Sequence, residues 1–509
     1  MSRTHGLRVR LRMPGGRRTA RGSSGAAEDG ATQESPSTEA GAVAPGGRPH
    51  AARRPRQAVV VIHGMGEQRP MSTLRGFADA AVPARLDGRP RYWSKPDEVS
   101  SSFELRRYVV ASTETRPVTD LYEFYWADKM AGNRLQDLLP LVRALMWRLP
   151  WRIRGSVRWF WVLGWLLLAA VVSVVVMTVV ERGPLALLDS PRDLLQQVTG
   201  ARGPVDDGDV ARSSVAGWSV LLGAVLLAVV PGLVVRSFGD VARYVDISPG
   251  NVGVRHDIMT AACELLERLH EPDRYDRIVV VGHSLGSMIG LDAITHHWAK
   301  VHDQYRPPAS AQPCLERVER LGPGLPVSRE EWPAAQRDLW SEQRRLGDPW
   351  KITDFVTVGS PLSHAGWLMA RRGDDLEGRF ARRELLRDPP QAEPSDGAHP
   401  YSYSTDDPQR GPWHLHHAAP FACTRWTNIW FPAAAGLFGD PFGGPLAELF
   451  GAGVVDRPVT AGRWWVRRRP FLAHISYWSD PDEPPQGYAN GHHVRLLREA
   501  LALDTSPAD

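Results

Sequence analysis

The sequence predicts an α/β fold, in which a mostly parallel sheet with flanking helices is interrupted by a pair of membrane-crossing helices. Three observations predict it. Short, apolar, β-branched runs recur along the chain and end in glycine-containing turns, as buried parallel strands do. Segments with apolar residues at helical spacing lie between these runs. Two long uncharged stretches occupy the middle of the chain.

Length and composition allow one large folded domain. The chain has 509 residues, of which 43% are hydrophobic, and its formal net charge is +4. Residues 1–56 hold eleven Arg against four acidic residues and few aromatic side chains. Such a segment cannot bury enough apolar surface to become ordered, so we expect a solvated basic tail with no nucleic-acid partner. No apolar stretch of signal-peptide length precedes Ala58.

The three cysteines, Cys263, Cys314 and Cys423, are widely spaced. Their spacing matches neither a zinc site nor a disulfide framework. We therefore expect buried, inert thiols and a catalytic domain in a reducing compartment.

Two segments are predicted to span a membrane. Residues 159–180 give 22 positions without a charge, and residues 213–235 give 23 more, interrupted by Pro231 and several glycines. About 20 apolar residues suffice for a helix to cross a bilayer. The alternative interpretation is a pair of buried core helices.

Charge placement predicts the orientation of this hairpin. Seven Arg flank it on its outer sides, whereas the linker 181–212 carries four Arg and six acidic residues. The positive-inside rule then places both flanks in the cytoplasm and the linker outside, in an inner-membrane protein with two spans. Residues 138–155 suit either a helix on the inner leaflet or an ordinary surface helix.

A predicted strand at Ala58–Ile62 leads into the sequence His63-Gly64-Met65-Gly66-Glu67-Gln68. This turn lacks both the G-x-G-x-x-G spacing and the P-loop lysine, which argues against nucleotide binding.

The second motif follows a predicted helix at 255–269 and a predicted strand at 276–281. It reads Gly282-His283-Ser284-Leu285-Gly286 and is followed by a predicted helix from Ser287 to Trp298. The pattern G-x-S-x-G between a strand and a helix is typical of a nucleophile turn, because its glycines allow a strained backbone that exposes the serine. Ser284 is the predicted nucleophile.

With these motifs the chain resembles the α/β-hydrolase superfamily, specifically bacterial membrane-associated hydrolases that read HG-x-GEQ early and V-x-HSLGS later. It is more distantly similar to lipases and to GPI inositol-deacylase-like enzymes. The resemblance covers about 58–130 and 240–500. It implies an α/β-hydrolase fold, the triad order Ser, acid, His, and an oxyanion hole from the backbone N–H groups of Met65 and Leu285.

The resemblance also implies the acid. After a predicted strand at 424–431, the segment Asp440-Pro441-Phe442-Gly443-Gly444-Pro445-Leu446 is similar to the family's acid-bearing loop, so Asp440 is the candidate. A plain turn is the alternative, because Asp-Pro is a general turn signal. Asp354, which stands at the start of a predicted strand and does not follow one, and Asp292, in the nucleophile helix, are weaker candidates.

The general base is implied in the same way. Residues Pro470 to Trp478 resemble the family's AHS-x-YW segment, which makes His474 the candidate, although Ile475 stands where Ser is usual. His492 and His493 are the alternatives. Ser360, in a Gly-Ser-Pro turn after a predicted strand at 354–358, rivals Ser284 only by residue type.

No cofactor or metal is expected. The clusters His296-His297 and His414, His416 and His417 lack the accompanying ligands of a zinc site, and we interpret them as surface or turn histidines.

The sequence therefore predicts a first hydrolase part, the membrane segment, a main hydrolase part and a short tail. Lid-like insertions are expected at 300–350 and 373–420. The predicted divisions are 1–56, 57–137, 138–236, 237–503 and 504–509.

The predicted function is hydrolysis of a carboxylic ester, with a lipid suggested by the membrane hairpin. Ser284 would attack, His474 would act as base and then acid, and Asp440 would orient it. The alternatives are an acyltransferase with the same triad and a catalytically silent membrane scaffold. The bilayer and an ester or lipid are the expected partners.

Overall fold

The computed structural model describes most of residues 54–130 and 239–459, together with 473–478, 493–504 and a few positions between 143 and 176. Shorter gaps lie at 67–68, 84–88, 100–104, 247, 328, 370–375, 394–398, 405, 407–410 and 434–437. The predicted basic tail up to residue 53, the linker 181–212 and the span 213–235 lie outside the described residues. The span 159–180 and the segment 138–155 are described only at scattered positions.

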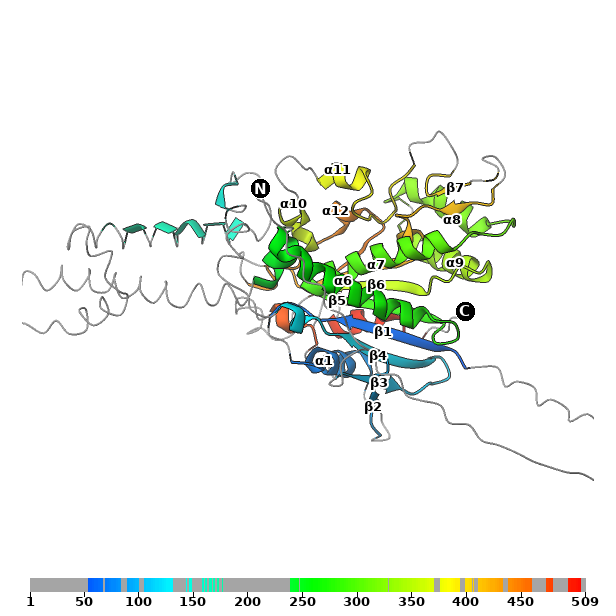
Figure 1. Ribbon diagram of the computed structural model, residues 1–509, viewed down its shortest axis with the longest axis horizontal. Helices are drawn as coiled ribbons and strands as arrows, with labels where there is room; N and C mark the ends of the chain where they lie inside the picture. Colours follow the sequence, from blue (N-terminus) through cyan, green and yellow to red (C-terminus); the bar gives the residue numbers. More distant parts are fainter. Residues whose placement is uncertain are drawn as a thin grey trace, which may run out of the picture. The chain divides into compact units, whose positions relative to one another are not determined.

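An eight-stranded sheet forms the centre of the domain, in the order β10-β9-β6-β5-β1-β4-β3-β2 (Figure 1). Its pairings are parallel except at one edge, where β2, β3 and β4 are antiparallel neighbours. The strands are β1 (Arg56–Ile62), β2 (Trp93–Pro96), β3 (Arg106–Val110), β4 (Val118–Phe124), β5 (Arg277–His283), β6 (Ile352–Val358), β9 (Arg425–Trp430) and β10 (Val455–Pro458).

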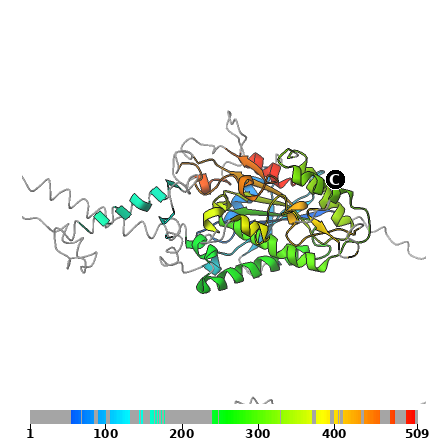
Figure 2. The same ribbon diagram turned by 90° about the horizontal axis from the view of Figure 1, so that it is seen from above.

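Helices cover both faces of the sheet. Because successive residues of a strand point to opposite sides, each buried strand contributes side chains to both faces. Val60 and Ile62 of β1 belong to the buried cluster that includes residues of α6, α7, α8 and α9, whereas Val59 and Val61 belong to the cluster that includes residues of α1 and α14. Figure 2 shows α6 (green) and α14 (red) on opposite sides of the strands. The main helices are α1 (Ser72–Ala81), α6 (Pro249–His270), α7 (Leu285–Gln304), α8 (Pro313–Leu321), α9 (Trp332–Arg345) and α14 (His493–Leu501).

This architecture confirms the predicted α/β class with a mostly parallel sheet. The predicted strands are all present, with ends that differ by a few residues. β1 pairs on one side with β4 and on the other with β5, so the parts before and after the predicted membrane segment share one sheet. Within the described part of the chain, no helix is both long enough and apolar enough to cross a bilayer.

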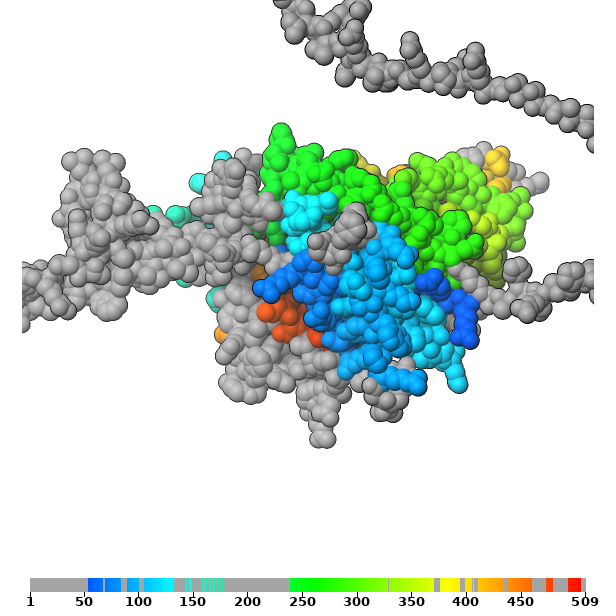
Figure 3. Space-filling model, turned by 60° about the horizontal axis from the view of Figure 1, so that its bottom comes forward, coloured from blue at the N-terminus to red at the C-terminus, as the bar shows by residue number. Residues whose placement is uncertain are grey.

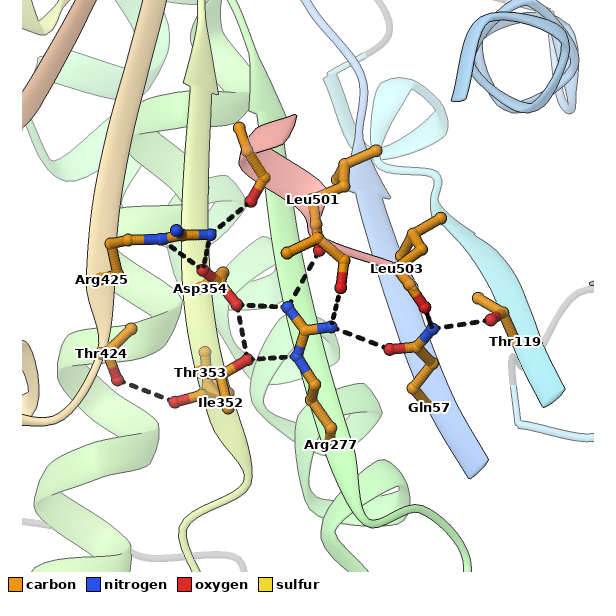
Figure 4. A network of polar contacts seen from close by, with 12 residues as sticks. Gln57, Thr119, Arg277, Ile352, Thr353, Asp354, Thr424, Arg425, Leu501 and Leu503 are labelled. Carbon is orange, nitrogen blue, oxygen red and sulfur yellow. Dashed lines mark hydrogen bonds and ion pairs between the residues drawn. The ribbon is translucent and has the colours of Figure 1, made fainter. Parts of the chain in front are cut away.

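Asp354 lies inside β6, which begins two residues before the predicted strand 354–358. Its carboxylate is buried between the guanidinium groups of Arg277 and Arg425, at 2.5 and 2.6 Å (Figure 4). Burial opposes ionisation, but these two cations lower the pKa of Asp354. The sequence could not show that this buried carboxylate has two arginine partners.

The same network anchors the end of α14 to the amino ends of the strands. Arg277 donates to the carbonyls of Leu501 and Ala502, and Gln57 donates to the carbonyl of Leu503 (Figure 4). The last carbonyls of a helix lack partners within the helix, so these donors satisfy groups that would otherwise be buried without a hydrogen bond.

The first predicted lid insertion contains two packed helices, α8 and α9. Trp332 and Leu339 of α9 are fully buried in the main core. In the second insertion, a two-stranded sheet pairs β7 (Ser402–Tyr403) with β8 (His414–Leu415), and a short helix, α11, spans Leu376–Ala381.

Candidate active site

The turn between β5 and α7 presents Ser284. Its backbone has φ 52° and ψ −126°, a conformation that L residues rarely adopt and that costs roughly 1–3 kcal/mol. A Cβ at Gly282 would lie 2.6 Å from the Gly286 carbonyl oxygen, and a Cβ at Gly286 would overlap the Ile62 carbonyl oxygen. Both glycines are therefore required by close backbone contacts, and the motif has the local geometry that its sequence predicts.

The structure brings the predicted serine, histidine and acid into one hydrogen-bonded chain. Ser284 Oγ lies 2.9 Å from His474 Nε2, and His474 Nδ1 lies 2.9 Å from Asp440 Oδ1. All three side chains are buried, with Ser284 1% and His474 5% exposed. Because the carboxylate accepts the proton of Nδ1, Nε2 is available to accept the serine proton.

Four donors surround the carboxylate of Asp440. Oδ1 also accepts from the amides of Phe442 and Gly443, at 2.9 and 3.1 Å, and Oδ2 accepts from the Tyr477 hydroxyl at 2.6 Å. Burial opposes ionisation, yet the pKa of Asp440 is lowered because His474, Tyr477 and the Gly443 amide stabilise the charged form. Tyr477 was not predicted as a partner of Asp440; its position three residues after His474, within the segment 470–478, was the available signal.

His283, the residue before Ser284, contacts His474. Its Nε2 donates to the His474 carbonyl oxygen at 2.9 Å. Burial lowers the pKa of His283 to about 3, so the ring is neutral and its hydrogen-bonded tautomer is set by that carbonyl. On the other side, Trp478 packs edge-on against Phe77 of α1 at 5.4 Å, and Figure 3 shows residues 473–478 (orange-red) beside the blue surface of α1.

The loop after β1 lies against Ser284. A Cβ at Gly64 would be 3.0 Å from the Ser284 Cβ, so this backbone is in direct contact with the serine. His63 is buried, which lowers its pKa to about 4, and its Nε2 accepts the Trp126 amide proton at 3.1 Å. Met65 follows Gly64, and Leu285 follows Ser284 as the first residue of α7. The two predicted oxyanion donors therefore belong to segments that meet at Ser284.

The rival candidates have other contacts. Ser360 Oγ accepts the Leu362 amide and caps a short 3-10 helix, Pro361–His364. Asp292 accepts hydrogen bonds from Tyr244 and Arg255. His493 packs against the Phe431 ring at 5.3 Å, and His492 lies outside the described residues.

The remaining histidines occur in separate contacts. The rings of His302 and His414 stack at 4.2 Å, and His416 Nε2 donates to the Gln391 carbonyl at 2.9 Å. His297 contacts His270 and is buried on the inner side of α7; since His414 and His416 are buried as well, the expectation of surface histidines was wrong for these three. Among the residues that the structure describes, no group of three or more His, Cys, Asp or Glu side chains could hold a metal ion.

Comparison of the chain with protein-family models, with curated proteins and with solved structures finds no match. A functional proposal for the chain therefore rests on the geometry of Ser284, His474 and Asp440.

Proposed function

We propose that the chain is a membrane-anchored serine hydrolase of the α/β-hydrolase fold that cleaves a carboxylic ester of a lipid. The observation that carries the proposal is the hydrogen-bonded chain from Ser284 through His474 to Asp440, with both links at 2.9 Å. A neutral imidazole in this position can accept the serine proton, and the carboxylate stabilises the imidazolium that results.

The reaction would proceed through an acyl-enzyme. Ser284 Oγ attacks the ester carbonyl while His474 Nε2 takes its proton, and the amides of Met65 and Leu285 stabilise the oxyanion. The tetrahedral intermediate then collapses, and His474 returns the proton to the departing alcohol. Water, activated by His474, attacks the acyl-enzyme, which releases the carboxylic acid and restores the serine. This chemistry requires neither a metal nor a cofactor.

The architecture supports the hydrolase-fold part of the proposal. Ser284 stands on a strained turn at the carboxyl end of β5, within a mostly parallel sheet, and the acid and base follow it in the chain. The carboxyl edge is where open α/β sheets place their binding sites.

The lipid part of the proposal rests on where the predicted membrane hairpin joins the fold. The chain leaves after β4, through a 3-10 helix at Ala127–Met130, and returns before α6. Arg243 Nη1 donates to the Met130 carbonyl at 2.9 Å and so links the two ends. Because β4 and β5 run parallel, these ends lie at the same edge of the sheet as Ser284. A hairpin inserted here would hold the site close to membrane lipids.

Fluorophosphonate labelling of membranes that contain the full chain tests the proposal. The wild type should be labelled, Ser284→Ala should not be, and the matched variant Ser360→Ala should behave as the wild type. Labelling that persists in Ser284→Ala would exclude Ser284 as the nucleophile. No labelling of the wild type would favour the catalytically silent scaffold instead. Product analysis with water or an added alcohol as acceptor would separate hydrolysis from acyl transfer.

A further inference from the structure

The loop that carries Met65 is held by one residue before and one residue after the predicted membrane segment. Asp240, in the helical stretch 239–245, accepts a 2.6 Å hydrogen bond from the Gly66 amide. Trp126, just after β4, donates its indole N–H to the His63 carbonyl at 3.0 Å and stacks on the His63 ring at 4.7 Å. Both ends of the loop are thus fixed by side chains that flank the membrane segment.

The stretch 239–245 is also attached to the nucleophile helix. Tyr244 donates a 2.7 Å hydrogen bond to Asp292 in α7, the helix whose first residue is Leu285. The same stretch therefore contacts both elements that carry a predicted oxyanion donor. Asp240 reaches the loop of Met65, and Tyr244 reaches the helix of Leu285.

We propose that Asp240 and Trp126 are positioning residues, which set the place of the Met65 amide relative to the Leu285 amide. The inference rests on the proposed function, because it concerns the oxyanion hole of that reaction. Oxyanion donors act only when they lie about 2.7–3.1 Å from the position where the charge develops. Gly66 has φ +97°, a conformation that glycine adopts readily and other residues rarely do. Because glycine also adopts many other conformations, contacts such as the Asp240 hydrogen bond are needed to keep this loop in one shape.

The two contacts differ in kind, so they can be removed separately. Asp240→Ala removes the acceptor for the Gly66 amide, whereas Asp240→Asn keeps a neutral oxygen acceptor of nearly the same shape. Trp126→Phe keeps a ring to stack on His63 but removes the indole donor. Glu342→Ala is the matched control, because Glu342 likewise accepts backbone amides, those of Cys314 and Leu315 at the start of α8.

The test measures two quantities with a fluorophosphonate probe on the full-length protein in membranes: the second-order labelling rate and the final labelled fraction. The phosphoryl oxygen of the probe occupies the oxyanion hole, so the rate reports its geometry. We expect Asp240→Ala to lower the rate about 100-fold, the loss typical of a missing oxyanion donor, at an unchanged final fraction. Asp240→Asn should recover most of the rate, Trp126→Phe should fall between them, and Glu342→Ala should match the wild type.

A structural role alone would lower the final fraction and leave the rate of the surviving molecules unchanged, which would overturn the inference. Equal labelling rates for the wild type and Asp240→Ala would also overturn the inference, while the proposed function would stand. If neither the wild type nor any variant reacts, the proposed function fails and the inference fails with it.

Discussion

Tyr477 donates a 2.6 Å hydrogen bond to Oδ2 of Asp440, while His474, three residues earlier, binds Oδ1 of the same carboxylate. One short segment therefore holds both oxygens of the acid. The Tyr477 hydroxyl also accepts the Phe431 amide at 3.0 Å and is buried, so no solvent can replace it.

Tyr477→Phe should lower both activity and stability. Loss of a hydrogen bond to a charged group costs about 1.5–3 kcal/mol, and part of it should appear as a roughly tenfold drop in kcat/KM. The free energy of unfolding, measured in urea, should fall by a similar amount. Tyr305→Phe, which removes a 3.3 Å bond to the Leu346 carbonyl in the 300–350 insertion, is the control and should keep the wild-type rate.

The three residues of the hydrogen-bonded chain should act as a unit. Ser284→Ala and His474→Ala should each lower kcat by several orders of magnitude, and the double variant should be scarcely worse than either. Asp440→Asn should lose about 10⁴-fold, less than either. Steady-state kinetics on an ester substrate measure these losses. A near-normal rate in His474→Ala, together with a lost rate in His493→Ala, would show that the base is misplaced.

The buried pair Arg277–Asp354 should matter far more for folding than an exposed pair. Asp354→Asn leaves the buried guanidinium group of Arg277 and the partly exposed one of Arg425 without this charged partner, so the free energy of unfolding should fall by about 3–5 kcal/mol. Asp338→Asn breaks the exposed pair with Arg317, at 2.7 Å, and should change it by less than about 1 kcal/mol. Urea unfolding of the two variants makes the comparison. Equal losses would contradict this account of the network.

Asp388 should make the free energy of unfolding fall as the pH rises from about 4 to about 8. Burial raises its pKa to about 8, although Trp332 and Gln336 donate hydrogen bonds to its carboxyl. The folded pKa thus exceeds the unfolded value of about 4, so the folded state binds the proton more tightly. Its contribution to stability is complete below the unfolded pKa and is lost as the pH rises through 8.

Between pH 7 and 8, the pH dependence of stability should come mainly from Asp388. Burial lowers the pKa of His63 and His283 to about 4 and 3, so these rings affect stability only in acid, below their unfolded value. Glu123, with a pKa that burial raises to about 7, acts mostly below this window. The free energy of unfolding should fall by about 1 kcal/mol from pH 7 to 8, and Asp388→Asn should flatten this slope. A slope that persists in the variant would assign the effect to another group.

The orientation of the predicted hairpin can be tested in intact cells. Each of the seven flanking Arg held near an anionic inner leaflet gains about 1 kcal/mol, which favours a cytoplasmic catalytic domain. Since β4 and β5 both pair with β1, the two flanks must lie on the same side of the membrane. Ser190→Cys, in the linker 181–212, should react with an impermeant maleimide from outside. A shielded linker with a protease-sensitive catalytic domain would mean the opposite orientation.

The sequence by itself determined the α/β class and the strained turn at Ser284, because both depend on local patterns. Buried parallel strands require continuous apolar runs such as 58–62, and the turn at Ser284 requires glycines at fixed offsets. The resemblance also named Asp440 and His474. Their distances to each other could not be known, since they come from loops that meet only when the sheet is formed.

Only the tertiary structure decided which polar residues have buried partners. Asp354 proved to be an ion-paired residue inside β6, Tyr477 a second donor to the acid, and Asp240 an acceptor for the Gly66 amide. Each of these contacts joins segments that are far apart in the chain or depends on a loop conformation. Spacing along a sequence records which residues share a face of a helix or strand, but not which other segment covers that face.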